Sequence, residues 1–189
     1  MMFYPLQTLL NGGIKDIMVV TGGESVGQFM ELLGSGSKYG CEFTYRVQDE
    51  AGGIAQALLL CEDFVDDDFV VILGDNIFDD KLVFNEPKLF LKYMDEAGRF
   101  GVFMDDKIIE KPSNIENGYV VTGCYVYPKE VFEFIKTLQP SARGELEITD
   151  VNNGFLDKLS IEYLDGFWTD AGTFDSLLAS SNWIKSFSS

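Results

Sequence analysis

Short apolar runs alternate with helical patterns along the first half of the chain. Residues 16–21 (D-I-M-V-V-T) and 69–73 (F-V-V-I-L) are continuous apolar runs typical of buried strands, and residues 42–48 alternate as a strand does. Between these runs, residues 26–33 and 54–61 carry apolar side chains at helical spacing. The order predicts an α/β fold, with a Rossmann-like, mostly parallel sheet and helices on both faces.

The rest of the chain predicts further elements within one domain over residues 1–189. At the N-terminus we expect a helix over residues 4–10 that Asn11, Gly12 and Gly13 end, and we expect Ser25 to cap the helix at 26–33. The less regular second half predicts strands over 90–93, 100–104, 107–110, 119–127 and 160–164, and helices over 130–138, 145–155 and 174–184.

The absence of histidine and the strong negative charge limit the catalytic groups, metal ligands and partners that this chain can have. The chain holds no histidine, which excludes histidine-dependent nucleophiles and leaves oxygen ligands, and so Mg²⁺ or Ca²⁺, for any metal site. A net charge of −17 argues against nucleic acid as a partner. An anionic small substrate would need a local pocket of cations, metal or backbone N–H groups.

The spacing of the cysteines and the hydropathy of the chain indicate where in the cell the protein is located. Cys41, Cys61 and Cys124 lie far apart without a C-x-x-C motif, which favours buried thiols in a reducing cytoplasm over disulfides or a zinc site. The chain has no apolar run of membrane-spanning length, and its first residues lack the pattern of a signal peptide. We therefore expect a cytoplasmic protein without a membrane partner.

Two aspartates follow apolar runs at places where ligands of α/β sheets bind. Asp75 comes after residues 69–73 and Gly74, and such a carboxylate either holds a divalent cation with a second carboxylate or bonds within its own turn. Asp170 precedes Ala171-Gly172-Thr173 and a helical run. The spacing alone favours a structural role for Asp170, in the segment that leads into a helix with Thr173 as its N-cap.

Four other residues are candidates for binding, each beside a structural alternative. Pro112 should hold Lys111 extended and aim its ammonium at a phosphate, although a surface lysine at a strand end is the commoner case. Gln48 carries the donor and acceptor that a pyrimidine edge needs, and Gly53 lies in a glycine turn before a helix. Arg143 suits either a phosphate or an ion pair with a nearby glutamate.

Several segments, taken in order, resemble the sugar-1-phosphate nucleotidylyltransferases, and among them the short tetrameric glucose-1-phosphate thymidylyltransferases. The segments are T-G-G-E at 21–24, L-L-G-S-G-S at 32–37, Q-D-E-A-G-G-I-A-Q-A-L at 48–58, V-I-L-G-D-N at 71–76, R-F-G-V at 99–102, E-K-P at 110–112, Y-V-V-T-G-C-Y-V-Y at 119–127, S-A-R-G-E-L-E-I-T-D-V-N at 141–152 and W-T-D-A-G-T at 168–173.

This resemblance implies a fold of the nucleotide-diphospho-sugar transferase type and a reaction. A phosphate oxygen of glucose-1-phosphate attacks the α-phosphorus of dTTP, and dTDP-glucose and pyrophosphate form; the pathway it implies is dTDP-rhamnose biosynthesis. It implies these roles: Asp75 and Asp170 hold Mg²⁺, Lys111 neutralises the sugar phosphate, Gln48 and Gly53 contact the base, Gly101, Glu110, Val121 and Trp168 contact the hexose, and Arg143 contacts phosphate or an interface.

The sequence departs from the family pattern at its start. The family's first strand and its triphosphate loop, L-A-G-G-x-G-T-R-L, are not in the printed sequence. We therefore expect either an incomplete record of a longer enzyme or a truncated homologue. The alternative to a thymidylyltransferase is a catalytically inactive subunit that binds sugar nucleotide or contributes to an oligomer.

Overall fold

The computed structural model describes residues 1–186, which form two compact units. The first unit holds Met1–Gly12, Val70–Tyr127 and the chain from Lys158 onward, and the second holds Gly13–Phe69 and Pro128–Asp157. No helix within residues 1–186 has both the length and the apolar character that crossing a membrane requires.

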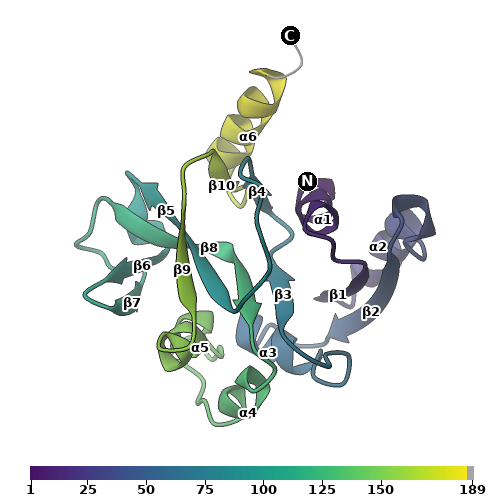
Figure 1. Ribbon diagram of the computed structural model, residues 1–189, viewed down its shortest axis with the longest axis horizontal. Coiled ribbons are helices and arrows are strands. Elements are labelled where there is room, and N and C mark those ends of the chain that lie inside the picture. The colour runs from purple at the N-terminus through teal and green to yellow at the C-terminus, as the bar shows by residue number, and fades with distance from the viewer. Residues whose placement is uncertain (187–189) are drawn as a thin grey trace. The chain divides into compact units, whose positions relative to one another are not determined.

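The first unit is built on a six-stranded mixed sheet (Figure 1). Its strands run in the order β7-β6-β8-β5-β9, and β3 also pairs with β8. Neighbours β5 and β9 are parallel, whereas the pairs β5–β8, β6–β8 and β6–β7 are antiparallel. The bounds are β3 Phe69–Ile72, β5 Lys88–Met94, β6 Gly101–Met104, β7 Lys107–Glu110, β8 Gly118–Tyr127 and β9 Ser160–Leu164, with a short 3₁₀ helix η2 at Ala97–Arg99.

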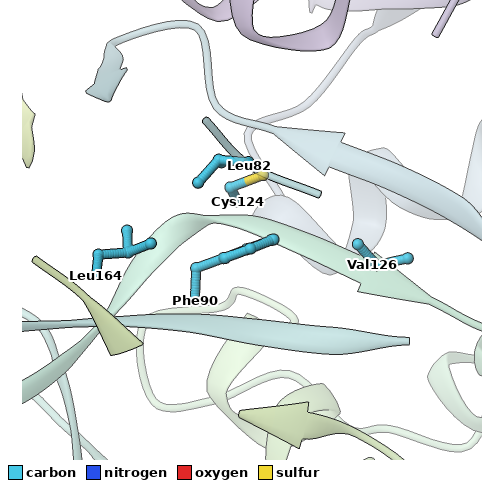
Figure 2. Close-up of a cluster of buried hydrophobic side chains, with 5 residues drawn as sticks. All are labelled: Leu82, Phe90, Cys124, Val126 and Leu164. Atoms are coloured by element: carbon cyan, nitrogen blue, oxygen red, sulfur yellow. The ribbon is translucent and has the colours of Figure 1, made fainter. Parts of the chain in front are cut away.

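The centre of this sheet carries an apolar core. Eight successive residues of β8 are buried, as expected for a strand covered on both faces. Figure 2 shows five of the buried side chains, from three strands and one loop, namely Leu82, Phe90, Cys124, Val126 and Leu164. Burial raises the pKa of the Cys124 thiol far above its usual value, so this cysteine behaves as a small apolar core residue.

Two three-residue strands form a separate antiparallel ladder in the first unit. These are β4 (Asn76–Phe78) and β10 (Trp168–Asp170), and helix α1 (Phe3–Asn11) packs against β4. Helix α6 (Phe174–Ser186) follows β10. Thr173 Oγ1 accepts a hydrogen bond from the Ser176 N–H at 3.1 Å, which confirms the predicted N-cap.

The second unit combines a parallel strand pair with helices. Strands β1 and β2 pair along their full length, from Asp16↔Glu42 to Gly22↔Gln48. Phe69 and Phe132 stack with ring centroids 5.0 Å apart, and α3, α4 and α5 pack together. The bounds are β1 Asp16–Gly22, α2 Val26–Leu33, η1 Ser37–Tyr39, β2 Glu42–Gln48, α3 Ile54–Leu59, α4 Val131–Ile135 and α5 Ile148–Phe155.

The α/β class and most predicted elements are confirmed, with several differences. Strand β3 pairs with β8 and is not in the two-stranded sheet of β1 and β2. Helix α5 begins at Ile148, because Glu147 is extended, so Glu145 and Glu147 precede the helix. Ser25 does precede α2, but among the described residues its side chain caps no backbone N–H, so the predicted cap is wrong.

The cysteines follow the expected pattern in part. All three are free thiols, as predicted, but only Cys124 is buried. Cys41 and Cys61 are partly exposed, and burial raises the pKa of Cys61 to about 11.

The β6–β7 hairpin provides a test of backbone strain. Its two-residue loop, Asp105-Asp106, has φ values of 50° and 53° between the paired residues Met104 and Lys107, as in a type I′ turn. Since a side chain in this region costs about 1 kcal/mol relative to glycine, we expect Asp106→Gly to raise the free energy of unfolding by about 0.5–1 kcal/mol in urea titrations. The matched control is Asp95→Gly, at an exposed turn without positive φ, which should not stabilise. A gain no larger than that of the control would contradict the account.

Candidate functional site

The β4–β10 ladder brings the two predicted metal ligands together. Asp170 ends β10 opposite Asn76, the first residue of β4, and Asp75 directly precedes Asn76. The Ala171 N–H donates to the Asp75 carbonyl at 2.8 Å. Two carboxylates that are 95 residues apart in sequence therefore start from adjoining backbone positions.

The two carboxylates converge on one open space beside Gly172. A Cβ built on this glycine would lie 3.6 Å from Asp75 Oδ2 and 3.6 Å from Asp170 Oδ2. Carboxylate oxygens that approach a common point are suitable ligands for Mg²⁺. In residues 1–186, no group of three or more acidic or cysteine side chains is placed to hold a metal ion. The donor set thus fits an ion held by two aspartates with water or substrate phosphates completing its shell.

The charge around Asp170 is only partly compensated. Its side chain is 25% exposed, and Arg99 Nη2 lies 3.4 Å from Oδ1 and 3.3 Å from Oδ2. Burial is the main cause that raises the pKa of Asp170, Asp75 raises it further, and the Arg99 guanidinium lowers it. A bound cation would stabilise the ionised carboxylate of Asp170 and so offset both the cost of its burial and its repulsion by Asp75.

Asn76 is a residue of the candidate site that the site assignment from sequence missed. Its Oδ1 accepts hydrogen bonds from the buried Gly123 N–H at 2.9 Å and from Trp168 Nε1–H at 2.8 Å. Its Nδ2 donates to Asp75 Oδ1 at 2.8 Å. Asn76 therefore orients both a predicted metal ligand and a predicted sugar-binding ring. The available signal was an amide directly after the strand-end aspartate in G-D-N.

Phe100 and Gly101, at the start of β6, contact most of the other residues of the first unit that were predicted to bind substrate. The Phe100 ring lies 5.2 Å from the ring of Trp168, and the Phe100 carbonyl accepts from the Lys111 N–H at 3.0 Å. Gly101 pairs with Glu110 across the β6–β7 hairpin. The β6–β7 pairing thus places Gly101, Glu110 and Lys111 on neighbouring backbone, and the Phe100 ring connects them to Trp168.

Lys111 does not have the predicted backbone conformation. Its φ is 42°, in the left-handed region, so the expectation that Pro112 holds it extended is wrong. The hydrogen bond from the Lys111 N–H to Phe100 fixes this conformation at the end of β7. The Lys111 side chain is half-exposed, and its ammonium lies 3.6 Å from Glu110 Oε1. Non-glycine residues with such strain cluster at functional sites.

Val121 lies apart from these contacts. It is a buried residue of β8, and its Cα partner is Leu91 on β5. The structure thus places Val121 in the six-stranded sheet and not in the β4–β10 ladder that positions Asp75 and Asp170.

The second unit holds the residues that were assigned to the nucleotide base. Gln48 ends β2, and its Nε2 donates to the Gly53 carbonyl at 3.2 Å and to Gln56 Oε1 at 2.7 Å. Gly53 has a φ of 92°, and a Cβ there would lie 2.6 Å from the Leu146 carbonyl oxygen. This position therefore requires glycine, and Gln48 is held beside it.

Arg143 is held by an acidic neighbour. Its Nη2 and Nε donate to the two carboxylate oxygens of Glu147 at 2.6 and 3.1 Å. Glu145 Oε2 lies farther away, at 3.8 Å from Arg143 Nη2. The bidentate geometry sets the direction of the guanidinium.

Loss of the Asn76 side chain should destabilise the first unit. Asn76→Ala would leave the Gly123 N–H and the Trp168 indole N–H without their acceptor, at a cost of about 2–4 kcal/mol in the free energy of unfolding. Chemical denaturation followed by fluorescence measures it. The exposed Asn85, which accepts from Lys88 at 3.0 Å, provides the control Asn85→Ala, with an expected loss below about 1 kcal/mol. Equal losses would refute the role of Asn76.

A methyl group at Gly172 should occupy the space between the carboxylates. Because a Cβ there makes only ordinary contacts, we expect Gly172→Ala to leave the melting temperature unchanged but to weaken Mn²⁺ binding by at least about tenfold. Titration followed by electron paramagnetic resonance measures the affinity. The control is Gly74→Ala, where a Cβ would meet no described atom within 4 Å. Unchanged Mn²⁺ affinity in Gly172→Ala would place the ion elsewhere.

Comparisons with known proteins identify the family of the chain. A family model described as nucleotidyl transferase matches residues 1–186. The glucose-1-phosphate thymidylyltransferase of Neisseria meningitidis serogroup A is 38% identical over 206 aligned residues, which cover 98% of this chain and 72% of the relative. The enzyme of that name from Mycolicibacterium smegmatis is 37% identical, covering 98% and 71%.

Solved structures give the same result. A Bacillus anthracis crystal structure, described as a glucose-1-phosphate thymidylyltransferase in complex with sucrose, matches at 47% identity with a TM-score of 0.89. The match covers 96% of this chain and 81% of that one. A UDP-glucose pyrophosphorylase with bound UDP-glucose matches at 20% identity with a TM-score of 0.80, covering 97% and 85%, and supports the fold alone. The chain belongs to the nucleotidyl transferase family.

Proposed function

We propose that this protein transfers a thymidylyl group from dTTP to glucose-1-phosphate, giving dTDP-glucose and pyrophosphate in a Mg²⁺-dependent reaction. The observation that carries the proposal is the convergence of Asp75 and Asp170 beside Gly172 in a chain of the nucleotidyl transferase family. The relatives named glucose-1-phosphate thymidylyltransferase, at 35–38% identity, support the choice of substrates.

The carboxylate pair accounts for the proposed metal dependence. Asp75 and Asp170 would hold Mg²⁺, which supplies neutralisation of phosphate charge when bound. Asn76 keeps the Asp75 carboxylate in place through its 2.8 Å hydrogen bond. Because phosphoryl and nucleotidyl transfer consist mostly of positioning and charge stabilisation, a rigid ligand pair is what the reaction requires of the protein.

The sugar phosphate is assigned to the residues around the β6–β7 hairpin. Lys111, whose side chain is half-exposed, would neutralise the phosphate of glucose-1-phosphate with its ammonium. Gly101, Glu110 and Trp168 would contact the hexose, and their connection through Phe100 supports a common role. Val121 keeps its assignment to the hexose as a prediction, without a described contact that links it to these residues.

The base is assigned to Gln48 and Gly53. The carboxamide of Gln48 is oriented by its hydrogen bonds to Gly53 and Gln56, and a fixed amide can read a pyrimidine edge. Arg143 is proposed as a phosphate or interface residue, and its pairing with Glu147 would have to yield for the first of these roles. A homotetramer, a cytoplasmic location and a place in dTDP-rhamnose synthesis complete the proposal.

Pyrophosphate release tests the proposed function. The purified protein, given dTTP, glucose-1-phosphate and Mg²⁺, should release pyrophosphate, and Asp170→Asn should lower kcat/KM by at least about a hundredfold because one metal ligand is lost. The melting temperature should stay close to that of the unaltered protein.

The control variant and a binding measurement separate the alternatives. Asp95→Asn, on an exposed turn, should retain full activity. Equal activity of Asp170→Asn and the unaltered protein would refute the metal assignment. Mg²⁺-dependent binding of dTDP-glucose without pyrophosphate release would instead identify a catalytically inactive sugar-nucleotide-binding subunit.

A further inference from the structure

Arg99 is a cation that the proposed chemistry does not use, although it contacts a proposed metal ligand. Its Nη2 lies 3.3 and 3.4 Å from the two oxygens of Asp170, whereas a strong charge-assisted hydrogen bond has a length of about 2.7–2.9 Å. The guanidinium therefore neutralises Asp170 electrostatically without a tight hydrogen bond.

The backbone that carries Arg99 is closely fixed. Arg99 ends η2, where the Ala97 N–H donates to the Glu116 carbonyl at 2.9 Å and the Phe100 N–H donates to the Ala97 carbonyl at 3.0 Å. A Cβ on Gly98 would lie 2.9 Å from the Pro112 carbonyl oxygen, so the turn is packed against its neighbour. Any movement of the guanidinium must come from side-chain rotation.

The side chain has room and a second partner for such a rotation. It is 38% exposed, and its guanidinium carbon lies 5.1 Å from the centre of the Phe100 ring. Glu96 Oε2 lies 3.8 Å from Arg99 Nη1, and the Glu96 side chain is 77% exposed. The guanidinium can thus leave Asp170 and stay paired on its own turn.

A divalent cation and this guanidinium compete for the same oxygens. Asp75 and Asp170 carry two negative charges that face one space, and Arg99 supplies one positive charge from the side of Asp170. A cation bound to Asp170 would lie within a few ångströms of the guanidinium and would be repelled by it. The two positive groups cannot both bind Asp170 at full strength.

We propose that Arg99 is an internal counter-ion, which neutralises Asp170 before metal binding and is displaced from this carboxylate when a divalent cation binds. The inference rests on the proposed function, because it takes Asp75 and Asp170 as the metal ligands. Arg99 is a positioning residue in this role. Arg99 would lower the affinity of the site for a free divalent cation. The site would therefore prefer a cation that is already bound to the phosphates of a nucleotide.

The test is Mn²⁺ binding without nucleotide, followed by loss of the free-ion signal in electron paramagnetic resonance at constant ionic strength. Arg99→Gln should bind Mn²⁺ roughly tenfold more tightly than the unaltered protein, because the repulsion is removed. Arg99→Met, which keeps an apolar stem against Phe100, is a second variant with the same expectation. Circular dichroism establishes that both are folded.

Arg46→Gln is the matched control. Arg46 is also 38% exposed and pairs with an aspartate, Asp63, in the second unit, so its loss changes the net charge equally. Its Mn²⁺ affinity should equal that of the unaltered protein. If Arg46→Gln tightens binding as much as Arg99→Gln does, the effect is one of overall charge and the inference is overturned.

The other outcomes separate the inference from the proposed function. Mn²⁺ binding by the unaltered protein, with equal or weaker binding by Arg99→Gln, overturns the counter-ion role and leaves the metal site in place. An absence of Mn²⁺ binding in both overturns the metal site and the counter-ion role together.

Discussion

The pairing of β4 with β10 is the constraint on which the first unit's site depends. Only three residue pairs form this ladder, yet the paired residues are 90 to 94 positions apart in sequence. The hydrogen bonds of Asn76 connect β4 to β8 through Gly123 and to β10 through Trp168. A Cβ on Gly123 would lie 2.5 Å from Asn76 Nδ2, so a glycine on β8 is also required. The positions of Asp75 and Asp170 are therefore consequences of packing.

The same packing leaves the site with more negative than positive charge. The fold brings two carboxylates to one open space and supplies one loosely held guanidinium in compensation. A protein with a net charge of −17 must provide local positive charge if it is to bind phosphates. In the proposed site, Lys111 and a metal ion would provide this charge, whereas Arg99 would offset the charge of Asp170. Such a division would allow an acidic protein to bind an anionic substrate.

Sequence reasoning predicted much of the fold, but less of what fixes the site. Strands β2, β7 and β9 have the predicted bounds, because their side-chain alternation or apolar runs are strong local signals. Strands β4 and β10 were not predicted, since three-residue strands carry no periodicity and their pairing is a long-range event. The role of Asn76 was hidden for the same reason, because its partners Gly123 and Trp168 are distant in sequence. The backbone of Lys111 was predicted from the local effect of Pro112, but a hydrogen bond to Phe100 overrides that preference.

The central claim is that Asp75 and Asp170 form one cation site, and anomalous X-ray scattering from Mn²⁺-soaked crystals tests it most directly. The account predicts an anomalous peak within about 2.0–2.3 Å of an oxygen of each aspartate, beside Gly172. Crystals grown with dTDP-glucose should show the same peak with a phosphate oxygen in the coordination shell. A peak at other carboxylates, or none at this pair in crystals that bind the sugar nucleotide, would contradict the account.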